Sequence, residues 1–197
     1  MQSVLDMVSH EAQRNVNILR NSSARGAYIA DCRNKIVEGF LNTTAEWLLF
    51  LDIDMVFAPD LVEALLSAAN DEDHERKILA GFYLTPTAQK PCSAWLVYGP
   101  NGKLQTIGSF NVGEVKEVAS VGMGGTLIHR SVLEAFPLAA DDWRWFGHDL
   151  IDGVRHGEDV TFCLRAAGLG FKSYGVGWVQ MGHIKSHVLD TAILKAA

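Results

Sequence analysis

Two aspartates, Asp52 and Asp54, directly follow an apolar run over residues 47–51, and only Ile53 separates them. Ligands of open α/β sheets bind beyond the carboxyl ends of the strands, so this position suits a binding site. Two carboxylates one residue apart can approach the same hard divalent cation or its waters. Such a cation can bridge the phosphates of a nucleoside diphosphate and neutralise charge as that group departs. Aspartate is also common where a strand simply passes into a loop, so the pair alone leaves both interpretations open.

A second acidic pair, Glu158 and Asp159, follows Gly157 at the start of a predicted helix. The helix dipole favours acidic residues in a first turn by ~0.3–1 kcal/mol, so a purely structural role also explains them. The preceding loop, residues 143–148, is aromatic and polar. Aromatic faces pack against sugars, and an acid beside such a loop has the chemistry of a general base.

Two further side chains suit the same chemistry. The imidazole of His183 is a good additional ligand for manganese-like ions beside carboxylates, although a lone histidine after a strand is more often structural. Arg33 lies close to the apolar stripe of a predicted helix, where its charge requires a carboxylate or a phosphate partner. A structural salt bridge and a ligand contact explain Arg33 equally well.

Composition narrows the class of partner. The chain has 197 residues, a net charge of −6 and no basic stripe, which argues against nucleic acid as the main partner. Cys32, Cys92 and Cys163 form no CxxC pair, which fits a reducing cytoplasm better than disulfides or a zinc site. No apolar run reaches the ~20 residues of a membrane helix, and residues 1–14 lack the pattern of a signal peptide. We therefore expect one soluble, cytoplasmic domain over residues 1–197, without a transmembrane segment.

Hydrophobic periodicity predicts an α/β fold. The apolar run over residues 47–51 is typical of a central strand in a parallel sheet, covered on both faces. Ser131 and Glu134 have the spacing of a capping box, and residues 99–102 form a hairpin turn. Helices are expected over residues 3–12 and 27–41, from residues 59 and 131 onward, and over 158–167. Strands are expected over residues 15–19, 47–51, 77–83, 94–98, 103–107, 121–129, 171–174 and 177–181.

This order, α/β first and hairpin-rich later, predicts a Rossmann-like three-layer sandwich with a mixed central sheet. Residues 1–90 would form a nucleotide-binding half. Residues 91–197 would form an acceptor half and a tail that closes the metal site.

Four segments stand in order along the chain: ADCRN at 30–34, WLLFLDIDMVFAPD at 47–60, GEDVTFCLRA at 157–166 and GH at 182–183. Together they resemble the family 2-like glycosyltransferases of GT-A fold, including small phage-type members. The ordered match runs from about residue 29 to 185, which is most of the chain.

The resemblance implies a metal and a donor site. Asp54 would coordinate Mn²⁺ or Mg²⁺, and His183 would complete the protein ligands. Asp52 would lie near the ribose and a metal-bound water, and Arg33 near the donor diphosphate or base. The donor would be a nucleoside diphosphate sugar, UDP- or GDP-linked.

The resemblance also implies catalytic and acceptor contacts. Asp159 would be the general base, and Glu158 would touch donor or acceptor. Gly124 and Gly125 would belong to a strand under the sugar, where side chains would obstruct it. The acceptor hydroxyl is unidentified, and we expect it to be contacted by Trp143, Trp145 and His148.

One departure concerns the start of the fold. Members of this family usually begin with a strand that helps hold the nucleotide base, and Met1 falls after that position. We expect either that the sheet is trimmed by that strand or that the reading frame begins further upstream. In both cases residues 15–19 or another chain would fill the gap.

The expected activity is transfer of a sugar to a hydroxyl, with inversion at the anomeric carbon. Two alternatives remain open. Residues 50–56 also look like the nucleophile strand of a haloacid dehalogenase-like phosphatase, although an acidic pair that opens a helix fits that class poorly. The chain would otherwise be a sugar-nucleotide-binding remnant without turnover. A nucleotidyltransferase would need a GxGTR-like phosphate loop, which the sequence lacks.

Overall fold

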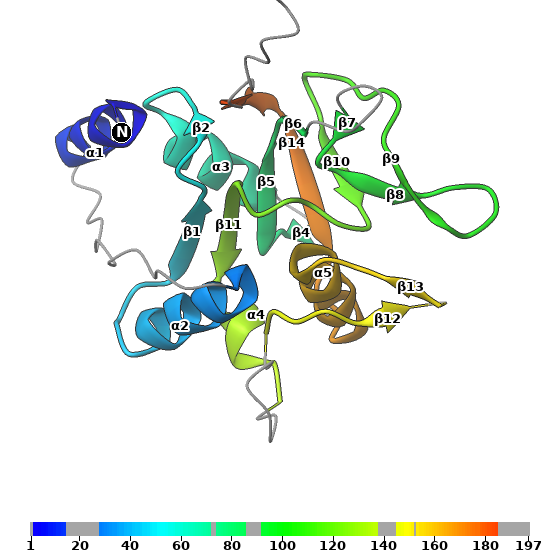
Figure 1. Ribbon diagram of the computed structural model, residues 1–197. Coiled ribbons are helices and arrows are strands. Elements are labelled where there is room, and N and C mark those ends of the chain that lie inside the picture. The colour runs from blue at the N-terminus through cyan, green and yellow to red at the C-terminus, as the bar shows by residue number, and fades with distance from the viewer. Residues whose placement is uncertain are drawn as a thin grey trace, which may run out of the picture.

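The computed structural model describes residues 2–14, 28–71, 74–85, 92–137, 145–151 and 153–184. Within these ranges the chain forms a mixed α/β structure around a five-stranded sheet (Figure 1). The strand order is β1 (Trp47–Leu51), β11 (Gly125–His129), β5 (Ile78–Phe82), β14 (Ser173–Gln180) and β10 (Val115–Val118). The described helices are α1 (Gln2–Gln13), α2 (Ile29–Leu41), α3 (Leu61–Ala69), α4 (Arg130–Glu134) and α5 (Glu158–Gly168).

Short two-stranded pairs surround this sheet. β8 (Leu96–Tyr98) and β9 (Leu104–Thr106) form the predicted hairpin, in which Gly102 has a φ of 74°. The other pairs are β2 (Met55–Val56) with β15 (Gly182–His183), β3 (Asn70–Asp71) with β4 (His74–Glu75), β6 (Leu84–Thr85) with β7 (Cys92–Ser93), and β12 (Leu150–Ile151) with β13 (Val154–Arg155).

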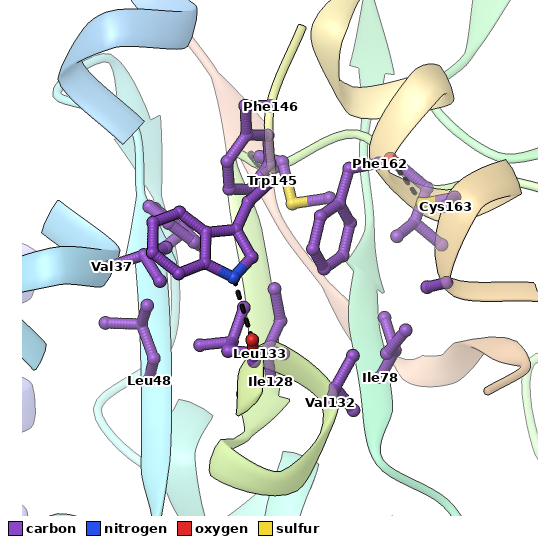
Figure 2. Close-up of a cluster of buried hydrophobic side chains, with 14 of the residues drawn as sticks. Val37, Leu48, Ile78, Ile128, Val132, Leu133, Trp145, Phe146, Phe162 and Cys163 are labelled. Atoms are coloured by element: carbon purple, nitrogen blue, oxygen red, sulfur yellow. Dashed lines mark hydrogen bonds between the residues drawn. The ribbon is translucent and has the colours of Figure 1, made fainter. Parts of the chain in front are cut away.

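Helices cover both faces of the sheet. Leu48 and Phe50 of β1 point into one apolar cluster, which is shared with α2, α4 and α5 (Figure 2). The alternate residues Trp47 and Leu49 pack on the opposite cluster, which is formed largely by α3 and joined by Met7 of α1. This alternation is the period of two that a strand imposes. The expected three-layer arrangement of helices, mixed sheet and helices is therefore present.

The strand directions bring several loops to one edge of the sheet. β1 and β5 both pair antiparallel with β11, so they run in the same direction, and β14 is parallel to β5. The carboxyl ends of β1, β5 and β14 and the amino end of β11 therefore lie along the same edge of the sheet, the one that runs across the strand ends. This is the edge at which Asp52 leaves β1.

The position predicted for the apolar run over residues 47–51 is wrong. Among the strands that the structure describes, β1 is the outermost strand of the sheet. It has β11 as its neighbour on one side, and the two strands are antiparallel. Its sequence still reads as a central strand because apolar clusters cover both of its faces. Burial of two faces and a central position in the hydrogen-bonded ladder are different properties. The predicted strand over residues 15–19 lies outside the described residues.

Two other local expectations are also corrected. Ser131 does not cap α4; instead His129 is the N-cap, and its imidazole accepts the Ser131 N–H at 3.2 Å. The two strands expected over residues 171–181 are one strand, β14, with an irregularity between Val176 and Gln180. Gly175 and Gly177 do not interrupt this strand.

No helix in the described part of the chain has the length and apolar character needed to cross a membrane.

A glycine-to-alanine exchange tests the packing of β14. A Cβ on Gly175 would lie 2.6 Å from ring atoms of Trp95, which is fully buried and donates its indole N–H to the Gly81 carbonyl at 3.1 Å. We expect Gly175→Ala to lower the free energy of unfolding by about 1–3 kcal/mol, because the ring has no room to retreat. Urea denaturation of the two proteins measures this difference.

Gly168→Ala is the matched control. Gly168 ends α5, and a Cβ there meets nothing within 4 Å. Alanine should stabilise this position by about 0.5–1 kcal/mol. Equal effects of the two exchanges would contradict the packing described around Trp95.

Candidate active site

Asp54 and His183 meet at the edge of the sheet where Asp52 leaves β1. β15 pairs with β2, which places His183 opposite Met55, and the Ile184 N–H donates to the Asp54 carbonyl at 2.8 Å. This backbone ladder joins the segment after β1 to the segment after β14, although they are far apart in sequence. The side chains of Asp54 and His183 consequently meet, with Nε2 of His183 3.1 Å from Oδ2 of Asp54.

The other ring nitrogen of His183 sets its tautomer. Nδ1 lies 3.0 Å from the Leu84 carbonyl, which can only accept a hydrogen bond, so Nδ1 carries a proton. In the neutral ring, Nε2 then presents its lone pair toward the Asp54 carboxylate. The Leu84 carbonyl thus fixes the orientation of the imidazole ring, as a carbonyl on Nδ1 commonly does for histidines that bind metals.

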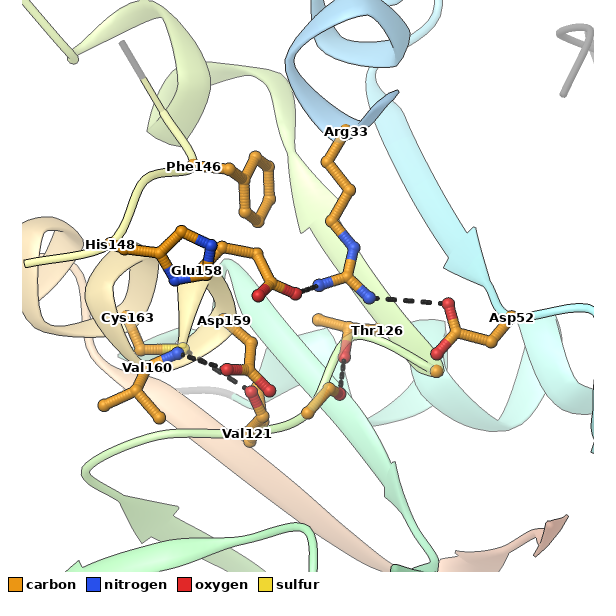
Figure 3. Close-up of polar contacts among 12 residues, drawn as sticks. Arg33, Asp52, Val121, Thr126, Phe146, His148, Glu158, Asp159, Val160 and Cys163 are labelled. Atoms are coloured by element: carbon orange, nitrogen blue, oxygen red, sulfur yellow. Dashed lines mark hydrogen bonds and ion pairs between the residues drawn. The ribbon is translucent and has the colours of Figure 1, made fainter. Parts of the chain in front are cut away.

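Arg33 is buried between two carboxylates. Its guanidinium pairs with Glu158 and, at 3.4 Å, with Oδ1 of Asp52 (Figure 3). Its Cζ lies 5.9 Å from the centre of the Phe146 ring. The side chains of Arg33 and Glu158 are 6% and 11% exposed, whereas that of Asp52 is 39% exposed. The carboxylate partner anticipated for Arg33 is thus supplied by the protein itself, and one edge of Asp52 still faces solvent.

Asp159 sits beside this network with its carboxylate largely enclosed. Burial raises the pKa of Asp159 above its ordinary value, and the neighbouring charge of Glu158 raises it further. The Val160 N–H, which donates to Oδ1 at 2.8 Å, and the charge of Arg33 act in the opposite direction. A partly buried acid with a raised pKa beside a network of charged groups has the properties of a general base.

Gly124 and Gly125 face side chains of the protein itself. A Cβ on Gly124 would lie 3.0 Å from the hydroxyl of Tyr83, and one on Gly125 would lie 2.3 Å from the sulfur of Met181. The glycines were expected to leave room for a sugar. The space in front of them is instead filled by Tyr83 and Met181, so that expectation is corrected.

Of the three aromatic-loop residues expected to contact an acceptor, one lies in the core, one lies on the surface and one lies outside the described residues. Trp145 is 2% exposed and donates its indole N–H to the Leu133 carbonyl at 2.8 Å, inside the cluster drawn in Figure 2. Phe146 is fully buried, and its backbone is held by both ends of the Asn34 amide. The expectation that Trp145 contacts an acceptor is therefore wrong, because the ring completes the core. His148 is exposed, with Nδ1 3.3 Å from the His156 carbonyl, and Trp143 lies outside the described residues.

Tyr83 belongs to the site, although its sequence pattern indicates only the end of a strand. Its hydroxyl accepts the Gly124 N–H at 3.1 Å, and its ring packs against that of His183. Burial raises the pKa of Tyr83 to about 12, and the charges of Asp52 and Asp159 contribute. The available signal was its place directly after β5, at the edge where β1 also ends.

The described residues contain no group of three or more His, Cys, Asp or Glu side chains arranged to hold a metal ion. Asp54 and His183 face each other, whereas Asp52 turns Oδ1 toward Arg33. Two of the three residues predicted as metal ligands, Asp54 and His183, are thus brought together, and Asp52 is placed next to them rather than with them.

Comparison with known proteins bears on the fold. No family model matches the sequence, and no curated protein matches it. Among solved structures, the chain is similar to the crystal structure of A197 from STIV, with a TM-score of 0.56 and 20% identity. The match covers 92% of this chain and 80% of that chain, and at this identity it supports a shared layered α/β fold.

Substitutions in the aromatic loop separate its core residue from its surface residue. Trp145→Ala should lower the free energy of unfolding by about 3–5 kcal/mol, because it leaves a large cavity and an unpaired Leu133 carbonyl. His148→Ala should change it by no more than about 0.5 kcal/mol, as is usual for an exposed side chain. Denaturant titration of both variants measures the contrast, and a mild effect of Trp145→Ala would argue against its buried placement.

Proposed function

We propose that this protein is a metal-dependent glycosyltransferase of the GT-A type. It would move a sugar from a nucleoside diphosphate sugar to an acceptor hydroxyl, with inversion at the anomeric carbon. The observation that carries the proposal is the 3.1 Å contact between Asp54 and His183, which come from the second and the last of the four segments that resemble family 2-like glycosyltransferases. The layered α/β fold and the mixed sheet are compatible with this class.

The donor set at Asp54 and His183 fits Mn²⁺ or Mg²⁺. One carboxylate and one neutral imidazole leave open positions for water and for phosphate oxygens, which hard divalent cations prefer. Such a cation, when bound, neutralises charge that develops on a departing diphosphate. Asp54 and His183 would hold it, and the Leu84 carbonyl would keep the imidazole oriented.

Arg33 and Asp52 form the donor side of the site in this proposal. Arg33 holds Oδ1 of Asp52 at 3.4 Å, while more than a third of that side chain remains exposed. The exposed part of the carboxylate is an acceptor suited to the hydroxyls of a ribose. Because Arg33 is already paired with two carboxylates, its part is to position Asp52 and Glu158.

Asp159 would act as the base. Its raised pKa makes the ionised carboxylate a better proton acceptor than an ordinary surface aspartate. It would take the proton of the acceptor hydroxyl as the oxygen attacks the anomeric carbon, while the bond from that carbon to the diphosphate breaks.

Removal of one charge at Asp54 tests the metal site. Mn²⁺ with UDP or GDP should raise the melting temperature of the native protein; a nucleotide at ~100 times its dissociation constant adds ~2.7 kcal/mol. Asp54→Asn should abolish the metal-dependent part of this shift, because a neutral amide is a poor ligand for a hard cation. Asp60→Asn, an equal change at an exposed aspartate in the same segment, should leave the shift unchanged.

Donor turnover then separates the possible activities. Sugar transfer or donor hydrolysis that requires Mn²⁺ would support the proposal, whereas phosphate release from simple phosphate esters would favour a phosphatase. Binding of the nucleotide without any turnover would identify a binding remnant. An Asp54→Asn variant with full activity would exclude the assigned metal site.

Asp159→Asn tests the base by two opposite effects. Turnover should fall about 10²- to 10⁴-fold, while Mn²⁺-dependent binding of UDP or GDP is retained. Stability at neutral pH should rise, because the folded protein pays to ionise a buried carboxyl whose pKa is raised. This gain should shrink as the pH falls through the folded pKa and vanish below the unfolded value.

Melting temperatures of the native and Asp159→Asn proteins across this pH range test the second effect. The asparagine still offers an oxygen to the Val160 N–H, so the local hydrogen bond is conserved. A variant that loses activity and stability together would indicate a structural role for Asp159 instead.

A further inference from the structure

Tyr83 lies where the two aspartates are held, although it belongs to none of the motifs that predict the site. It directly follows β5, between the strands that lead to Asp52 and to His183. The residue is 5% exposed, and its side chain makes two contacts of different kinds. The hydroxyl meets backbone on one side, and the ring meets an imidazole on the other.

The hydroxyl contact leads to Asp52. Tyr83 Oη accepts the Gly124 N–H at 3.1 Å, and the Gly124 carbonyl accepts the Asp52 N–H at 3.4 Å. The hydroxyl also fits closely against this backbone, because a Cβ on Gly122 would lie 2.2 Å from it. Gly124 therefore links the two residues: its N–H donates to the Tyr83 hydroxyl, and its carbonyl accepts from the Asp52 backbone.

The ring contact leads to Asp54. The rings of Tyr83 and His183 meet edge to face, with centroids 5.5 Å apart and planes at 89°. The next residue, Leu84, supplies the carbonyl that lies 3.0 Å from Nδ1 of His183. Two consecutive residues thus fix the imidazole by packing and by hydrogen bonding, and its Nε2 faces the Asp54 carboxylate.

We propose that Tyr83 is a positioning residue that sets both aspartates through separable contacts, its hydroxyl acting on Asp52 through Gly124 and its ring acting on Asp54 through His183. This inference rests on the proposed function for the part that concerns ligand binding. The raised pKa of Tyr83 keeps the hydroxyl protonated throughout the neutral range, so the contact with Gly124 does not change with pH.

NMR on the ligand-free protein tests whether the hydroxyl contact with Gly124 and the ring contact with His183 are separable. Tyr83→Phe removes the hydroxyl and keeps the ring, whereas Tyr83→Leu removes both. We expect the Gly124 amide resonance to move in both variants. The His183 imidazole resonances should stay in place in Tyr83→Phe and move in Tyr83→Leu.

The functional part is tested by binding of Mn²⁺ alone and of UDP at saturating Mn²⁺. Tyr83→Phe should keep the Mn²⁺ affinity within about twofold and weaken UDP binding about five- to tenfold, as expected for one lost hydrogen bond. Tyr83→Leu should weaken Mn²⁺ binding as well, by about 10- to 100-fold, as is typical when the support of a ligand is removed.

Thr126→Val is the matched control for loss of a buried hydroxyl. Thr126 is fully buried and donates to the Gly122 carbonyl at 2.8 Å, in the same segment but without a contact to Gly124. Thr126→Val should lower the free energy of unfolding and leave the affinities for Mn²⁺ and for UDP within about twofold of those of the native protein.

The outcomes separate the two proposals. If the native protein binds neither Mn²⁺ nor UDP nor GDP, the proposed function is overturned, and the NMR comparison still decides the geometry. Native binding that His183→Ala abolishes and Tyr83→Leu preserves would overturn the role of Tyr83. Identical effects of Tyr83→Phe and Tyr83→Leu on His183 and on Mn²⁺ would show that the two contacts are not separable.

Discussion

The guanidinium of Arg33 is the charge around which the site is organised. It extends from α2 and meets Glu158 at the start of α5 and Asp52 at the end of β1, so it joins three elements that are distant in sequence. An arginine this deeply buried is tolerated only with partners, and loss of one partner from a buried pair typically costs about 3–5 kcal/mol. The helices on one face of the sheet are therefore tied to the strand that carries the aspartates. The pairing of these charges and the packing of α2, α5 and β1 therefore depend on each other.

The direction of the strands also determines which residues reach the site. Because β1, β5 and β14 run the same way, the residues that follow them arrive at one edge without any long excursion of the chain. This arrangement brings together Asp54, Tyr83 and His183, each of which follows one of these strands. In the proposed glycosyltransferase, the metal ligands and their support would come from three strand ends, and the base Asp159 from the first turn of a helix.

The sequence predicted much of this arrangement. The runs that form β1, β5, α3 and α5 were recognisable because burial and helical spacing leave strong periodic patterns. The approach of His183 to Asp54 followed from the order of motifs rather than from periodicity. Local rules failed where partners distant in sequence decide the structure. The edge position of β1 depends on which strand pairs with it, and the glycines of β14 accommodate Trp95 and the backbone near residues 111–114 instead of ending the strand.

The same reason explains the errors in the site. Trp145 and its neighbours read as a surface for a sugar because aromatic residues beside glycine and histidine look like a loop. The partners that bury Trp145, among them Leu133 and Val37, are distant in sequence. Tyr83 was missed because a tyrosine that ends an apolar strand carries no motif. Its importance arises only when Gly124 and His183 are brought to it.

The packing of Gly124 and Gly125 affects how mutational data on this region should be interpreted. Each has the van der Waals surface of a neighbouring side chain where its own Cβ would stand, Tyr83 in one case and Met181 in the other. An inactive alanine variant at either position would therefore also reflect displacement of these side chains, and not the shape of a bound molecule alone. Compensating exchanges that shorten Met181 would have to accompany Gly125→Ala before any loss could be assigned to the ligand.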